Sequence, residues 1–243
     1  MSATANEVIA ALQQHASTSD ATFLQRFFKT GEGQYGADDT FIGVRVPQTR
    51  AVCRQFKDLP LNEIQKLLDS RIHEHRLAAV ILLADQYVKA NEPMQKQIYE
   101  LYLKNVRHNR VNNWDLVDSS AEFIVGPWLA DKSKDILFDL AATDSIWCRR
   151  VGIMAAFDYI KKGDATVTIE LAEVLLQDKQ DLIQKAVGWQ LREVGKRVDK
   201  RLLLDFLDKH AHDMPRTTLR YALEHLSVEQ KAHYMKAISR KNT

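Results

Sequence analysis

The chain has 243 residues, enough to bury a large apolar core without disulfide bridges. Its 34 basic and 32 acidic residues give a formal charge of +2, so binding to a polyanion would depend on where the charges lie. The two cysteines fit neither a disulfide framework nor a metal site, and no apolar run approaches the ~18 residues of a membrane span. We therefore expect a cytoplasmic protein without metal or membrane anchor.

Apolar residues recur at spacings of three and four along the chain, and only nine glycines and five prolines interrupt them. This periodicity predicts an all-α protein. We expect helices, with ends placed to within about two to four residues, at 6–15, 23–29, 47–56, 61–68, 74–89, 93–104, 112–124, 132–142, 146–161, 165–177, 182–197, 200–209, 216–225 and 227–238.

A weak internal repeat relates several of these helices. Arg150, Lys185 and Arg220 each precede small or apolar residues and are spaced 35 residues apart, and Arg76 begins a similar segment 74 residues before Arg150. A period of this length with two helices per unit is typical of α-solenoids. We therefore predict a single domain over residues 1–243, built from HEAT-like helix pairs with a concave DNA-binding face.

A glycine pattern in the N-terminal part needs a separate interpretation. Gly31, Gly33 and Gly36 match the spacing G-x-G-x-x-G. The dinucleotide fingerprint requires a strand before the glycines and a helix after them. Here the preceding residues favour a helix and the following residues do not, so we predict a flexible loop.

An indole and a carboxylate share one face of the predicted helix 112–124. At about 100° per residue, Trp114 and Asp118 lie within about 40° of each other, and Leu116 points the opposite way. Taken alone, the pattern fits a structural edge of the core as well as a functional pair.

The predicted helix 182–197 carries a tryptophan among cations. Lys185, Trp189, Arg192 and Lys196 fall within about 60° of one another, and apolar residues occupy the far side. An aromatic ring among cations is a common way to contact a nucleic-acid backbone and its sugars. We therefore favour a functional role and expect the three cations to bind phosphates without sequence preference.

Arg150 is flanked by Ile153, Met154 and Phe157 on the helix surface. Burying a guanidinium without a partner costs several kcal/mol, so Arg150 needs a phosphate or a carboxylate such as Asp118. A purely structural ion pair is an equally good alternative.

The histidines do not indicate a metal site. His73 and His75 would lie about 160° apart on a helix and cannot ligate one ion there. No Ser/His/Asp grouping stands out, and Cys148 has no neighbouring base. A nucleophile-based mechanism is therefore not indicated.

Four segments in this order resemble the DNA alkylation repair enzymes, which are AlkD-like alkylpurine DNA glycosylases made of HEAT-like repeats. The segments are FIGVRVP at 41–47, NWDLVD at 113–118, IWCRR at 146–150 and IQKAVGWQLRE at 183–193. The resemblance covers nearly the whole chain. It implies a catalytic aspartate at Asp118.

The resemblance also implies roles for other residues. It places the two sugar-contacting tryptophans at Trp114 and Trp189 and the active-site arginine at Arg150, and we expect Arg149 beside it to bind DNA. Near the N-terminus the chain departs from the family. Phe27 stands where a tyrosine is expected, Arg45 stands where a glutamine can contact the base opposite the lesion, and the loop after Lys29 is longer. Phe27 and Arg45 are thus expected DNA contacts, and these changes bear on lesion choice.

The implied reaction is hydrolysis of the N-glycosidic bond of a cationic N-alkylated purine in duplex DNA. A cationic purine is already a good leaving group, so one carboxylate can stabilise the oxocarbenium-like sugar and position water while aromatic faces attract the developing cation. The resemblance implies a monomer without cofactor that can leave the lesion stacked. The alternatives are a non-catalytic HEAT-repeat protein that binds DNA by shape and a protein-binding scaffold. The presence of Asp118 argues against the first, and Trp189 on a basic face argues against the second.

Overall fold

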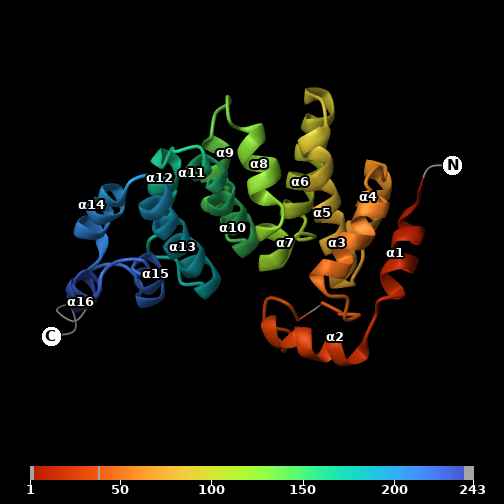
Figure 1. Ribbon diagram of the computed structural model, residues 1–243, viewed down its shortest axis with the longest axis horizontal. Coiled ribbons are helices and arrows are strands. Elements are labelled where there is room, and N and C mark those ends of the chain that lie inside the picture. The colour runs from red at the N-terminus through yellow and green to blue at the C-terminus, as the bar shows by residue number, and fades with distance from the viewer. Residues whose placement is uncertain (1–2, 38, 238–243) are drawn as a thin grey trace. The chain divides into compact units, whose positions relative to one another are not determined.

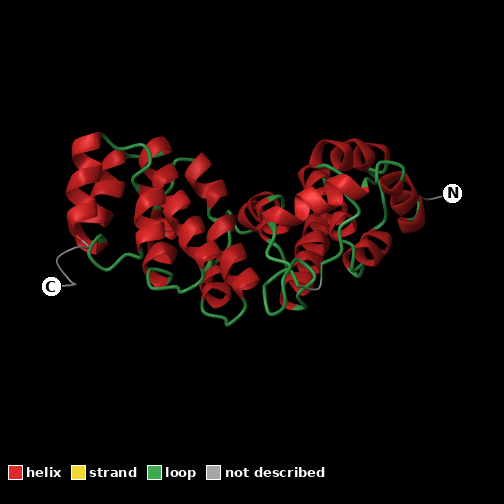
Figure 2. Ribbon diagram, turned by 90° about the horizontal axis from the view of Figure 1, so that it is seen from below, coloured by secondary structure: helices red, strands yellow, loops and turns green. Residues whose placement is uncertain are grey.

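The computed structural model describes residues 3–37 and 39–237, and every regular element in these residues is a helix (Figures 1 and 2). Their one isolated β-bridge joins Thr40 and Ile72. The predicted all-α class is therefore confirmed. None of the helices in the described ranges is long and apolar enough to cross a membrane. Internal contacts divide the chain into two compact units, Met1–Trp128 and Leu129–Thr243.

The first unit is built around α5 (His73–Lys89), which packs against α3, α4, α6 and α8. Residues 73–84 of α5 are all buried. From Leu77 to Ala84 the helix is apolar on every side rather than along one stripe, whereas the four residues before it are polar and need partners inside the protein. The other elements of the unit are α1 (Ala5–Gln13), α2 (Thr18–Leu24), the 3-10 helix η1 (Gln25–Phe27), α3 (Val46–Gln55), α4 (Leu61–Leu68), α6 (Glu92–Arg107), α7 (Trp114–Asp118) and α8 (Ala121–Trp128).

The second unit is built around α13 (Asp181–Arg197), which packs against α10, α11, α12, α14 and α15. Its other helices are α9 (Asp135–Ala141), α10 (Ile146–Ala155), α11 (Phe157–Lys161), α12 (Thr166–Val174), α14 (Lys200–His210), α15 (Arg216–Ala222) and α16 (Val228–Ala237). At Gly188 of α13, an added Cβ would lie 2.4 Å from the Thr218 carbonyl oxygen. The missing side chain therefore permits α13 and α15 to approach closely.

The predicted repeat is visible in the helix starts of the second unit. The helices α10, α13 and α15 begin at Ile146, Asp181 and Arg216, which are 35 residues apart (181 − 146 and 216 − 181). Helices therefore recur at the predicted period and stack side by side within the unit, as in an α-solenoid (Figure 1). That residues 1–243 act as one domain with a concave DNA-binding face stays a prediction.

Three predicted helices differ from the structure. The predicted helix 112–124 is interrupted after Asp118, where the Ser120 hydroxyl donates a hydrogen bond to the Leu116 carbonyl oxygen at 2.6 Å. A serine that bonds the preceding turn competes with helix continuation.

The other two differences concern where helices begin and bend. The predicted helix 146–161 is interrupted at Ala156, whose ψ of −13° and i→i+3 bond from Tyr159 depart from α geometry. The predicted helix 23–29 instead begins at Thr18, because the Ser17 side chain caps it, and gives way to η1. The end of the predicted helix 227–238, at Ile238, lies outside the described residues.

Candidate active site

A buried charge network lies beneath the start of α7. His73 at the start of α5 is 2% exposed, and its two ring nitrogens contact carboxylates from different segments. The Nε2 atom lies 2.7 Å from Asp115 Oδ2, and the Nδ1 atom lies 3.4 Å from Asp39 Oδ2. Arg76 of α5 contacts the other oxygen of Asp39. Three of these charged side chains, Asp39, His73 and Arg76, are therefore buried together, and Asp115 lies at the edge with 13% of its side chain exposed.

The network holds His73 in its charged form. Burial would lower the pKa of His73, but the carboxylates of Asp115 and Asp39 outweigh it and raise the pKa to about 9. Burial would likewise raise the pKa of Asp39, and here the hydrogen bond from His73 and the charge of Arg76 prevail and lower it. Near neutral pH every charge in the network has an opposite partner, which is the condition for burying ions without a large penalty.

The same network fixes the helix that carries the predicted catalytic pair. Asn113 caps α7 by accepting a hydrogen bond from the Trp114 amide at 2.9 Å, and its Nδ2 donates to Asp39 at 3.0 Å. Asp115 accepts from His73. A helix of five residues has little stability of its own. The orientation of Trp114 and Asp118, both half-buried, therefore depends on these anchors.

An aromatic cluster covers the network. The ring of Phe28 stacks on Trp114 at 5.5 Å and on Phe41 at 4.9 Å, and Phe41 stacks on His73 at 4.7 Å. The structure thus brings Phe28 to Trp114, whereas the resemblance implies a role for the neighbouring Phe27. The ring of Phe27 is 58% exposed, so a DNA contact by it stays a prediction.

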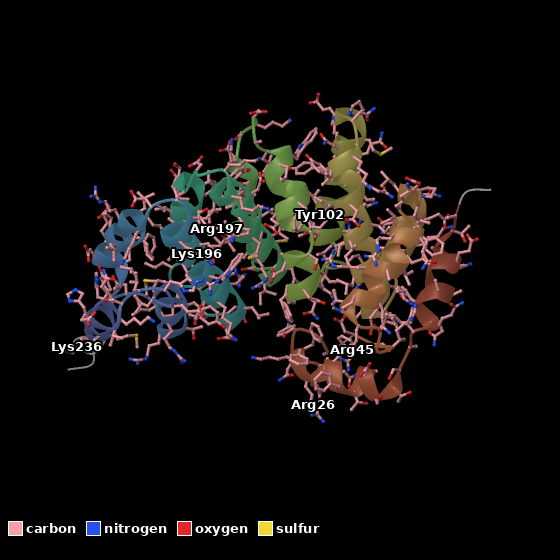
Figure 3. All side chains as sticks on the ribbon, in the orientation of Figure 1. Arg26, Arg45, Tyr102, Lys196, Arg197 and Lys236 are labelled. Atoms are coloured by element: carbon pink, nitrogen blue, oxygen red, sulfur yellow. The ribbon has the colours of Figure 1, made fainter. Side chains whose placement is uncertain are left out.

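Arg45, the residue before α3, is exposed beside α2 (Figure 3). Its guanidinium forms a two-pronged pair with Asp20, with Nη2–Oδ1 and Nε–Oδ2 distances of 2.7 and 3.0 Å. Exposed pairs of this kind are weak, so Arg45 can exchange Asp20 for another anion. Its expected DNA contact stays a prediction.

Several bonds hold the segment between η1 and α3, among them the β-bridge at Thr40 and the pairs of Asp39 described above. The Gly36 amide donates to the Lys29 carbonyl oxygen at 2.8 Å and closes a small loop. The buried carboxylate of Glu74 accepts hydrogen bonds from the backbone amides of residues 42–44 at 2.8 to 3.3 Å. Gly43 has φ of +80°, a conformation that favours glycine. In the described residues, helices precede the glycine pattern, and the next regular element begins only at Val46. The segment therefore lacks the strand before and the helix directly after the glycines that a dinucleotide fingerprint requires, as predicted.

In the second unit, the two neighbouring arginines of α10 have different surroundings. Arg150 is 7% exposed, and its Nη1 donates to the Leu182 carbonyl oxygen at 2.6 Å. Arg149 forms an ion pair with Asp178 at 2.7 Å and donates to the carbonyl oxygens of residues 143 and 144. The Nε and Nη1 atoms of Arg149 are therefore engaged within the protein, and its expected DNA contact stays a prediction.

Trp189 lies at the border between apolar core and charged surface. Its half-buried ring is 4.6 Å from the ring of Phe157 and packs on a cluster that includes Ile160 and Val194. The Arg192 guanidinium lies 6.0 Å from the ring centroid. The prediction that Trp189 lies on the basic face of its helix, away from the apolar side, is therefore wrong in part, because its ring also packs on Phe157 of α11.

The predicted basic face of α13 is partly neutralised. Lys185 pairs with Asp181 at 2.7 Å. Arg192 pairs with Glu193 at 2.9 Å and also contacts Glu224, two residues after the end of α15. Lys196 is exposed near Arg197 (Figure 3) and makes no ion pair with any described residue. Of the three predicted phosphate contacts, Lys196 is therefore the one whose charge is least compensated.

No group of three or more potential metal ligands occurs among residues 3–37 and 39–237.

A family model described as DNA alkylation repair enzyme matches residues 8–226. The chain belongs to the DNA alkylation repair enzyme family. A solved structure described as a predicted DNA alkylation repair enzyme from Enterococcus faecalis is similar, with a TM-score of 0.67 and 16% identity over 88% of this chain and 98% of that chain. The comparison with curated proteins found no match.

In this DNA alkylation repair family member, the predicted site residues fall into two groups. Trp114 and Asp118 share α7 in the first unit, while Arg150 and Trp189 belong to the second unit. The residues that fix α7, of which His73 is central, were not predicted from the sequence. Its partners are 34 and 42 residues away in the sequence, so no helical periodicity could reveal them.

Proposed function

We propose that this protein is a DNA glycosylase that hydrolyses the N-glycosidic bond of cationic N-alkylated purines in duplex DNA. The observation that carries the proposal is the anchoring of α7, which holds Trp114 and Asp118 on a short helix fixed by buried charges. Membership of a DNA repair family supports a DNA substrate. We further propose that the protein acts as a monomer without cofactor.

The proposed chemistry requires little acid catalysis. An N-alkylated purine leaves as a neutral base, so the main demand is to stabilise positive charge that develops on the sugar. The Asp118 carboxylate meets this demand by its charge and positions the attacking water, and the face of Trp114 attracts the same cation. We propose Trp189 as a further sugar contact and Arg150 as a phosphate contact.

The decisive variant is Asp118→Asn, which keeps the shape of the side chain and removes its charge. We expect release of methylated purine from duplex DNA to slow by about 10²- to 10³-fold, while DNA affinity and melting temperature stay near wild type. Asp58→Asn is the matched control, because this side chain is 87% exposed and plays no part in the network. Wild-type release by Asp118→Asn would refute the assignment.

A second experiment tests the dependence on lesion charge. Because the mechanism uses the positive charge of the alkylated base, duplexes containing uracil should be poor substrates for the wild-type protein. Base release is measured by chromatography on both duplexes under the same conditions. Equal excision of uracil and methylpurine would contradict the mechanism. Binding of duplex DNA without any base release would favour a non-catalytic shape-binding protein.

A further inference from the structure

A polar pocket of about 390 Å³ opens in the first unit next to the buried network. Three arginines line it, namely Arg71 between α4 and α5, Arg76 of α5, and Arg110 between α6 and α7. The predicted roles do not use this pocket, although Asp39 and Arg76 belong to both its wall and the network under α7.

Hydrogen bonds fix the two loops that carry Arg71 and Arg110. The Ser70 carbonyl oxygen accepts from Arg76 Nη1 at 2.8 Å, and its hydroxyl oxygen accepts from the Ile72 amide at 3.1 Å. On the other side, Asn109 adopts φ of +57° and the Arg110 amide donates to the Asn105 carbonyl oxygen at 2.8 Å. This is a common way to end a helix. Ordered loops present Arg71 and Arg110 with little further loss of backbone entropy on binding.

The charges around the pocket leave an excess of positive charge. Two carboxylates face the three guanidinium groups. Asp39 is already satisfied by Arg76, by protonated His73 and by asparagine amides. Asp69 is half-exposed and lies 3.1 Å from Arg110 Nε, in a pair of the kind that contributes at most about 1 kcal/mol. Arg71 is exposed and has no ion-pair partner in the described part of the chain. An anion can therefore enter without breaking a strong pair.

We propose that this pocket binds a phosphate group through Arg71 and Arg110, with Arg76 adding charge from the wall. The planar guanidinium matches two phosphate oxygens at once, which favours phosphate over smaller anions. The backbone of a DNA strand is one source of the phosphate, and this source rests on the proposed action on DNA. Free phosphate is the other source and is independent of that proposal.

The first arm of the test measures binding of undamaged duplex DNA by fluorescence anisotropy at several salt concentrations. Arg71→Ala and Arg110→Ala should each lower the slope of log affinity against log salt by about 0.9, and Arg71→Lys should restore most of the slope. Arg54→Ala is the matched control, because Arg54 is also exposed, has no ion-pair partner among the described residues, and lines a different cavity of the same unit. Its slope should stay at the wild-type value.

The second arm titrates inorganic phosphate against chloride at equal ionic strength and follows the backbone amide resonances of residues 69–71 and 109–112. A reduced DNA slope in the two variants identifies a DNA phosphate. Unchanged slopes, with phosphate-dependent shifts in the wild type that Arg71→Ala abolishes, identify free phosphate. Unchanged slopes without such shifts overturn the site. Because the DNA is undamaged and the readout is binding, this outcome is separate from success or failure of the glycosylase assay.

Discussion

Titration of His73 should make the stability of the protein fall across the neutral to alkaline range. The folded state holds the pKa of His73 at about 9, against an ordinary value of 6.5. At about 1.36 kcal/mol for each step of one in pKa, this difference corresponds to about 3 kcal/mol of unfolding free energy. Because the folded pKa is raised, the contribution is fully present below pH 6.5 and is lost as the pH rises through about 9.

The neighbouring His75 does not obscure this window. Burial, followed by the charge of Arg76, lowers the pKa of His75 to about 4. A histidine with a lowered pKa favours the folded state above its ordinary value, and that contribution fades as the pH falls toward 4. The two histidines therefore act in adjoining ranges, with His73 alone of the pair titrating on the alkaline side.

The assay is urea unfolding followed by circular dichroism at 222 nm between pH 6.5 and 9.5, with wild type, His73→Gln and His15→Gln compared. His15 is exposed on the chain just after α1, so its variant should keep the full pH dependence, whereas His73→Gln should lose it. The imidazole resonances of His73 in the wild type provide a second measurement that needs no stable variant. A titration of folded His73 near 6.5, or an alkaline stability loss that survives in His73→Gln, would refute the reasoning.

Two further variants test single contacts. Phe28→Leu removes the ring that stacks on Trp114 and should slow methylpurine release. The matched control is Phe23→Leu, whose exposed ring on α2 should not affect the rate; equal rates in the two variants would contradict a role for the stack. Arg149→Ala leaves Asp178 without its ion-pair partner and mostly buried, so it should lower the free energy of unfolding by about 3 kcal/mol in urea. Unchanged stability would contradict a structural role for the pair, and a smaller salt slope of DNA binding in the same variant would support the expected DNA contact.

Much of the fold could be predicted from sequence because helices follow local spacing. The 35-residue spacing of the helix starts at Ile146, Asp181 and Arg216 was likewise predictable, because the sequence repeat has the same period. The breaks near Ser120 and at Ala156 could not be predicted, because each depends on how one turn bonds or bends rather than on the apolar pattern. No glycine or proline marks either break.

The candidate site was predictable only where its residues are close in sequence. Trp114 and Asp118 are four residues apart on one helix, so periodicity placed them together. The partners of His73 and the contact between Arg192 and Glu224 cross between elements, and the latter two residues are 32 positions apart. One sequence without structure contains no signal for such pairs. For the same reason, the burial of one side of Trp189 by Phe157 was not foreseen.

The bonds that hold the segment between η1 and α3 indicate where this protein can tolerate insertions. The bond from Gly36 to Lys29 closes the exposed turn 30–35 on itself, and Glu74 separately holds residues 42–44. For a flexible surface loop with fixed ends, doubling its length costs only about 0.6 kcal/mol of closure entropy. We therefore expect residues inserted within 31–34, which are exposed, to leave α3 and α5 undisturbed. A new segment could therefore be inserted in this turn, near Phe28, with little loss of folding free energy.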